Sequence, residues 1–103
     1  MIWAAGGYDG LVTTEDVTVS ISYAAGNIGT RGASESLGTT IKAGHTYIGA
    51  YIIDNRNTSA FNATVQGNGP NNTAHFCAYR ATGNAVSNAS VTVRKVWLKT
   101  GGA

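Results

Sequence analysis

Apolar residues alternate with polar ones along most of this chain, and this period of two narrows the possible folds more than any other feature. In the stretch VTVSISY at 17–23, valine, isoleucine and tyrosine alternate with threonine and serine. The same period recurs in AFNATVQ at 60–66 and in SVTV at 90–93. Because successive side chains of a strand point to opposite faces of a sheet, each stretch predicts a half-buried β-strand. No stretch has the helical period, so we expect an all-β protein.

Gly- and Asn-rich segments separate the expected strands. GNGPNN at 67–72 and TGNAVSNA at 82–89 are both typical of turns. The first of these turns lies between 60–66 and the strand-like AHFCAYRA at 74–81, which predicts a hairpin. Short strands at such spacing are typical of antiparallel sandwiches. We therefore expect an antiparallel β-sandwich of about eight strands, of the jelly-roll type, with a single domain over 1–103.

Two further segments carry specific expectations. AAGNIGTRGASES at 24–36 has no period, so we expect it to be an irregular connection. LGTTIKAGHTYIGAYIID at 37–54 is expected to form a short strand that turns at KAG into a longer one. The longer strand has apolar residues on both faces, which favours a central position in its sheet.

The C-terminal strand contains a break in the alternation. Val91 and Val93 fall on one parity, whereas Val96 and Leu98 fall on the other. A β-bulge at Arg94-Lys95 would absorb one residue and return all four aliphatic side chains to one core. The core set expected from these periods is Val17, Val19, Ile21, Phe61, Val65, Phe76, Val91, Val93, Val96 and Leu98.

The proposed bulge would turn Trp97 outward, together with Thr92, Arg94 and Lys99. An outward tryptophan between cations favours a contact with another subunit or with a flat sugar ring. The alternative is that Trp97 packs against its own chain. We take an interface or glycan contact as the first hypothesis, and its candidate residues are Trp3, Tyr8, Tyr79, Arg94 and Trp97.

Composition and charge exclude several classes of partner. Only 12% of the residues are charged, and the net charge of +2 arises from 7 Lys and Arg against 5 Asp and Glu. These charges are scattered without a basic run, so we expect no nucleic-acid binding. No stretch approaches membrane-spanning length, and the N-terminal MIWAAGGYDG lacks the pattern of a signal peptide. We therefore expect a small, complete product made in the cytoplasm, with no membrane partner.

The sequence offers no catalytic constellation. Its five acidic residues are spread over expected turns and strand edges, and neither His45 nor His75 accompanies a nucleophile motif. The single cysteine, Cys77, is flanked by strand-like aromatics and is expected to be a small buried hydrophobic residue. We therefore expect no enzymatic activity and no cofactor.

The segment IIDNRNTSA at 52–60 raises the question of a calcium site. Asp54, Asn55 and Asn57 offer the oxygen ligands that calcium uses. A turn held by side-chain-to-backbone hydrogen bonds explains the same residues with fewer groups. No metal site is assigned on this basis, and calcium near Asp54 stays open at the level of the sequence.

Two segments together carry a family resemblance. IKAGHTYIGAYIIDN at 41–55 and ATGNAVSNASVTVRKVWLKTG at 81–101 resemble jelly-roll domains of the carbohydrate-binding-module type found in bacteriophage virion proteins. In those domains a turn of the AGxTY kind opens a central strand, and a strand of alternating valines ends the domain. The resemblance implies a jelly-roll fold and a place on the virion.

The function that this resemblance implies is non-enzymatic. We expect a capsid decoration protein that stabilises the shell through oligomeric contacts, as a homotrimer bound to the major capsid protein or another virion protein. The alternative is a carbohydrate-binding, receptor-recognition domain of a tail fibre or tailspike, whose partner would be a host surface glycan. In either case the mature location is the virion, after synthesis in the host cytoplasm.

Overall fold

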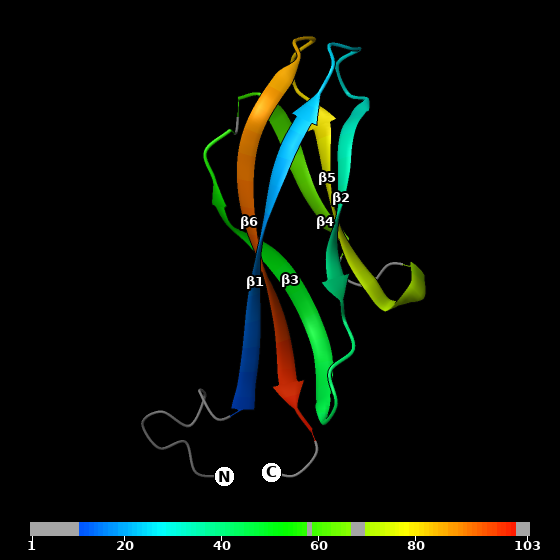
Figure 1. The fold of residues 1–103 in the computed structure, drawn as a ribbon, viewed down its shortest axis with the longest axis vertical. Coiled ribbons are helices and arrows are strands. Elements are labelled where there is room, and N and C mark those ends of the chain that lie inside the picture. The colour runs from blue at the N-terminus through cyan, green and yellow to red at the C-terminus, as the bar shows by residue number, and fades with distance from the viewer. Residues whose placement is uncertain (1–10, 58, 67–69, 101–103) are drawn as a thin grey trace.

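Two antiparallel sheets make up the structure, a computed structural model that describes residues 11–57, 59–66 and 70–100 (Figure 1). The elements over these residues are β1 (Val12–Tyr23), β2 (Arg31–Thr39), β3 (His45–Asn55), β4 (Phe61–Gln66), the short 3-10 turn η1 (Pro70–Asn72), β5 (Thr73–Arg80) and β6 (Val86–Lys99). Sheet A has the strand order β1-β6-β3, and sheet B has the order β2-β5-β4. The expected all-β sandwich is confirmed, with six strands among the described residues in place of about eight.

The chain changes sheet at every connection but one. Only β4 and β5 are consecutive strands that pair within one sheet, and they form the expected hairpin. β6 lies at the centre of sheet A and β5 at the centre of sheet B. In Figure 1 the sheets overlap in the upper half, and the lower ends of β1, β3 and β6 extend beyond sheet B. The β2–β3 connection runs beside this lower part of sheet A.

The hydrophobic core lies between the two sheets. Six members of the expected set are buried there, and Val17 and Val65 are packed against them. The aromatic rings of Phe61 and Phe76 meet edge to face, with 6.4 Å between their centroids. The buried members of the expected set are Val19, Ile21, Phe61, Phe76, Val91 and Val93. Leu37, Ala74, Ala78 and Ala89 are also buried but were not in that set.

The predicted bulge at Arg94-Lys95 is wrong. β6 pairs with β1 without a register shift from Leu98 opposite Val12 to Ala89 opposite Ile21. The alternation therefore continues, and Lys95 and Trp97 share the inner face with the core valines. Val96 and Leu98 fall on the outer face, where Leu98 is 39% exposed, so their assignment to the core is also wrong.

Three other expectations are corrected. β3 is an edge strand and not the central strand that its two apolar faces predicted, and only one of these faces meets the core. The segment expected to be irregular contains β2 from Arg31 onward, which pairs with β5 with two register shifts. At Gly32 an added Cβ would lie 2.7 Å from the Tyr23 ring, so a small residue is needed there for the strands to pass. Cys77 alternates with the buried Phe76 and Ala78 and is half-buried on the outer face of sheet B.

Arg80 fastens the β1–β2 connection to the end of β5. Its guanidinium donates hydrogen bonds to the carbonyl oxygens of Ala24 and Arg31 and to the Thr30 hydroxyl, at 2.8–3.3 Å. It also lies over the Tyr23 ring, 5.1 Å from the centroid. One side chain thus joins both ends of a connection that has no regular structure before β2.

We expect Arg80→Ala to lower the free energy of unfolding by about 1–2 kcal/mol, because several hydrogen bonds and a cation–π contact are lost together. The amide of Gly29, which donates to the Arg80 carbonyl oxygen at 2.8 Å, should exchange its hydrogen faster as the connection loosens. Arg56→Ala is the matched control, since the Arg56 side chain is 89% exposed. Equal stabilities for the two variants would contradict the fastening role.

Candidate functional site

The structure does not bring the predicted contact residues together. Tyr79 lies on the outer face of sheet B, Arg94 on the outer face of sheet A, and Trp97 on the inner face of sheet A. Trp3 and Tyr8 lie outside the described residues. The described members therefore do not form a single aromatic platform, and the site must be sought from the geometry itself.

Trp97 is buried, so its predicted outward orientation is wrong and the alternative of packing within its own chain holds. Its side chain is 1% exposed, and its indole Nε1 donates a hydrogen bond to the Thr40 carbonyl oxygen at 2.7 Å. The Tyr47 ring meets it edge to face with 5.6 Å between centroids. The ammonium groups of Lys42 and Lys95 lie 4.9 Å and 5.4 Å from the ring centroid. Trp97 thus fastens the β2–β3 connection to sheet A.

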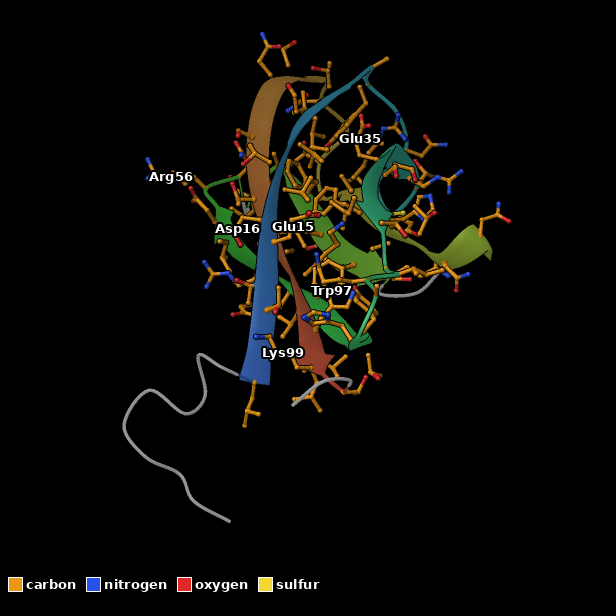
Figure 2. All side chains as sticks on the ribbon, turned by 60° about the horizontal axis from the view of Figure 1, so that its bottom comes forward. Glu15, Asp16, Glu35, Arg56, Trp97 and Lys99 are labelled. Atoms are coloured by element: carbon orange, nitrogen blue, oxygen red, sulfur yellow. The ribbon has the colours of Figure 1, made fainter. Side chains whose placement is uncertain are left out.

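The contacts of Lys95 explain how β6 keeps a regular alternation with a lysine on its inner face. Its Nζ lies 2.6 Å from a carboxylate oxygen of Glu15 and donates a hydrogen bond to the Thr39 carbonyl oxygen at 3.1 Å. Glu15 is directly opposite Lys95 in the β1–β6 register. Figure 2 shows Glu15 and Asp16 on opposite sides of β1, with Glu15 toward the interior. A buried cation is tolerated on the inner face because its charge is paired and hydrogen-bonded.

Tyr47 carries a buried polar atom. Its hydroxyl has no hydrogen-bond partner among the described residues, and burial raises the pKa of the phenol above its usual range. A raised pKa keeps the phenol neutral at physiological pH. The Tyr47–Trp97 cluster is therefore an internal packing unit, which leaves the exposed surfaces as the places where a partner can bind.

The outer face of sheet A carries the principal exposed apolar surface found on the described strands. An open groove of about 360 Å³ is lined by residues of β3 and by Val96 of β6. Ile48 is 57% exposed and Tyr51 is 51% exposed, both large side chains in contact with solvent. The residues that line the groove are Ile48, Gly49, Ala50, Tyr51 and Val96. We call this surface the β3 groove.

Gly49 forms the open centre of the β3 groove. Its φ of +148° lies in a region that glycine adopts readily and other residues rarely do, and nothing lies within 4 Å of a Cβ built there. The register with β6 shifts between Tyr47 and Gly49, so one residue of β3 is unmatched at this point. The irregularity therefore lies at Gly49 in β3 and not at Arg94-Lys95 in β6, and this register shift shapes the groove.

A neutral ion pair borders the β3 groove. Arg94 donates two hydrogen bonds to the Asp16 carboxylate, at 2.8 Å and 3.0 Å. The hydrogen bond that Arg94 donates lowers the pKa of Asp16, and the hydrogen bonds that Arg94 makes with Asp16 and then with Tyr51 raise the pKa of Arg94. Because the carboxyl pKa is lowered on folding, the contribution of this pair is present at neutral pH and is lost only below the usual carboxyl range. The rim of the β3 groove therefore carries two opposite charges whose sum is zero.

The titratable groups elsewhere serve local structure. One ring nitrogen of His45 lies 3.0 Å from the Thr13 hydroxyl and the other lies 2.8 Å from the Ala43 carbonyl oxygen. The Asn57 amide donates to the Asn55 side-chain oxygen at 2.9 Å, as the turn hypothesis requires, and Asp54 pairs with Arg56 at 3.5 Å. Within the described ranges, no three His, Cys, Asp or Glu side chains gather as metal ligands would.

Comparisons with protein-family models, with curated proteins and with solved structures find no match to this chain. Over the described residues, no helix has the length and apolar character needed to cross a membrane. The residues of the β3 groove would have been hard to find from sequence. Their one signal is Gly49, a glycine inside an otherwise apolar strand, which often marks a bulge or a close approach of another group.

Proposed function

We propose that this protein is a non-enzymatic virion surface protein that decorates a phage capsid and stabilises it through contacts between subunits. The observation that carries the proposal is the β3 groove, an open apolar surface on a sheet face whose neighbouring charges cancel. Large exposed apolar surfaces rimmed by polar groups are typical of protein interaction sites. The groove would lie against another subunit, and the sandwich would act as its rigid support.

We infer that the sandwich is a reduced jelly roll. A jelly roll wraps an antiparallel ribbon so that its first strand pairs with its last and its second with the one before the last. Here β1 pairs with β6 and β2 pairs with β5. When such a ribbon is rolled up, its third strand comes to lie beside the last and its fourth beside the one before the last, and the orders β1-β6-β3 and β2-β5-β4 match this arrangement with six described strands in place of eight. This inference supports the proposed virion role, because the resembling phage domains share that topology.

A host glycan is the second candidate partner of the same face. Tyr51 is half exposed beside the Arg94–Asp16 pair, and a flat aromatic ring next to paired polar groups suits a sugar ring. Under this alternative the protein would be a receptor-recognition domain of a tail fibre or tailspike. Saturable binding of host surface polysaccharide that is lost in Tyr51→Ala, with the fold retained, would favour it over decoration.

The test of the decoration proposal is electron microscopy of purified phage particles that carry or lack this chain. We expect regularly spaced density on the shell that disappears when the chain is absent, and shells that break at lower temperature without it. Density confined to the tail, or shells of unchanged appearance and stability, would overturn the proposal.

Ile48→Asp should abolish the contact made by the β3 groove. A carboxylate at this position would lose its hydration on assembly without gaining a partner, so we expect about a tenfold or greater loss of occupancy on particles lacking the native chain. Thr64→Asp places the same charge on the exposed outer face of sheet B and should bind as the unchanged chain does. Equal binding of both variants would exclude the β3 groove as the docking surface.

A further inference from the structure

Ile28 is the most exposed large hydrophobic residue among those described, with 71% of its surface accessible. It lies in the turn Asn27–Thr30, which joins β1 to β2. The Thr30 amide and hydroxyl both donate hydrogen bonds to the Asn27 carbonyl oxygen, at 3.2 Å and 2.6 Å. A single exposed isoleucine needs no explanation, but one fixed at the tip of a turn can insert into a partner at little entropic cost.

The turn is held rigidly against β5. The Gly29 amide donates to the Arg80 carbonyl oxygen at 2.8 Å, and the Arg80 amide donates to the Thr30 carbonyl oxygen at 2.9 Å. The Arg80 guanidinium adds its hydrogen bonds to the Thr30 hydroxyl and the Arg31 carbonyl oxygen. Ile28 is therefore an apolar knob on a preorganised support.

The turn and the β3 groove lie on separate parts of the molecule. In Figure 1 the β1–β2 connection is at the upper end, whereas β3 begins at the lower end. A copy that inserts its turn into a neighbour therefore keeps its own groove free for the next copy. Contacts between two different surfaces of identical chains are heterologous, and they close into rings when the rotation permits.

We propose that Ile28 of one copy binds in the β3 groove of the next, above Gly49 and between Ile48 and Tyr51. The contact joins copies of this chain head to side, and it specifies the oligomer that the proposed function requires. It rests on the proposed function only for its place on the virion, because the contact itself forms between copies of this chain alone.

The area of sheet A favours this arrangement over a symmetric dimer. Three strands at about 4.8 Å spacing and ten residues at about 3.4 Å give a face of roughly 14 by 34 Å, or about 480 Å². A stable interface of standard size removes about 800 Å² from each partner. Two copies joined only by these faces would fall short. A turn seated in the groove covers less area than the whole face, so this contact needs a closed ring, in which each copy makes two contacts.

A polar contact between Arg31 and Asp16 would accompany the insertion of Ile28, although the net charge at the rim is zero because Asp16 is already paired with Arg94. Arg31, three residues after Ile28, is exposed and is joined by no ion pair to a carboxylate of the described residues. The side chain of Asp16 at the rim of the groove is 43% exposed and can accept a further hydrogen bond beside its pair with Arg94. An incoming turn would therefore bring a cation toward a carboxylate.

Sedimentation velocity of the full chain tests the proposal. Ile28→Ser removes the knob and Ile48→Asp closes the groove, and each variant alone should be monomeric, with association weakened about tenfold or more. Mixed in equal amounts, the two variants can make one contact but no closed ring, because the first retains an intact groove and the second an intact turn. We therefore expect the mixture to associate more strongly than either variant alone, but less strongly than the unchanged chain. Ile41→Ser is the matched control, since Ile41 is 64% exposed but lies outside both surfaces.

The outcomes separate the alternatives. A monomeric unchanged chain at high micromolar concentration, or an Ile28→Ser variant that still assembles, would overturn the contact. Two variants whose association is no stronger when mixed than when each is alone would also overturn it. Circular dichroism of each variant shows whether the fold is retained. Particle occupancy that survives Ile28→Ser would leave the decoration proposal standing while this contact fails.

Discussion

Trp97→Ala is expected to lower the free energy of unfolding by about 3–5 kcal/mol, the range for removing a buried aromatic side chain. The side chain fills the space between sheet A and the β2–β3 connection, so its removal leaves a cavity. The Thr40 carbonyl oxygen loses the indole donor at 2.7 Å, and the ring contacts with Tyr47, Lys42 and Lys95 disappear. Urea unfolding followed by circular dichroism measures the change.

Leu98→Ala is the matched control, and it tests which face of β6 carries Trp97. Leu98 is the next residue of β6, points to the opposite face and is 39% exposed, so we expect a loss of about 1 kcal/mol or less. If β6 contained a bulge at Arg94-Lys95, Leu98 would be the core residue and the two losses would be reversed. Comparable losses for both variants would contradict the placement of Trp97 on the inner face of β6 and Leu98 on the outer one.

Lys95→Ala is expected to lower the free energy of unfolding by about 2–3 kcal/mol, because a long buried side chain is truncated and the Thr39 carbonyl oxygen loses its donor. Glu15 remains half exposed after the change and can be hydrated, so no stranded buried charge is added. The thermal or urea midpoint of the variant, compared with that of Lys99→Ala at an exposed position of the same strand, measures the effect.

Two further variants separate charge from packing at Lys95. Lys95→Met keeps most of the volume and should retain more stability than Lys95→Ala, because apolar replacement of buried ion pairs is often tolerated. Glu15→Ala leaves the Lys95 ammonium buried with the Thr39 carbonyl oxygen and the Trp97 ring, and we expect a loss of about 2 kcal/mol. If Glu15→Ala had no effect, the pair would contribute nothing and the burial of Lys95 would need another cause.

The period of two located the strands because it depends only on which side of a sheet each residue faces. It predicted the buried faces of β1 and β4 and the hairpin of β4 with β5. It failed at Lys95, since an inward lysine breaks the apolar pattern unless its partner is known. The partner was present in the sequence: Glu15 has the same parity as Val17 and Val19, so a charged pair opposite each other on two strands was the available signal.

The candidate site was less accessible from the sequence than the fold. The β3 groove depends on an edge position for β3 and on a register shift at Gly49, and both follow from pairing with β6 rather than from the order of residues in β3. The aromatic residues selected as contacts were chosen by type, and the structure disperses the described ones over different surfaces. Of the described members of that set, only Arg94 borders the groove.

The central claim is that the outer face of sheet A is covered by another protein subunit in the virion. Hydroxyl-radical footprinting of the isolated chain, diluted until it is monomeric, and of intact particles measures this directly through Tyr51, which is 51% exposed in the chain alone. Tyr79, on the outer face of sheet B, is the internal reference. We expect strong protection of Tyr51 in particles with little change at Tyr79, whereas equal modification of Tyr51 in both samples would contradict the claim.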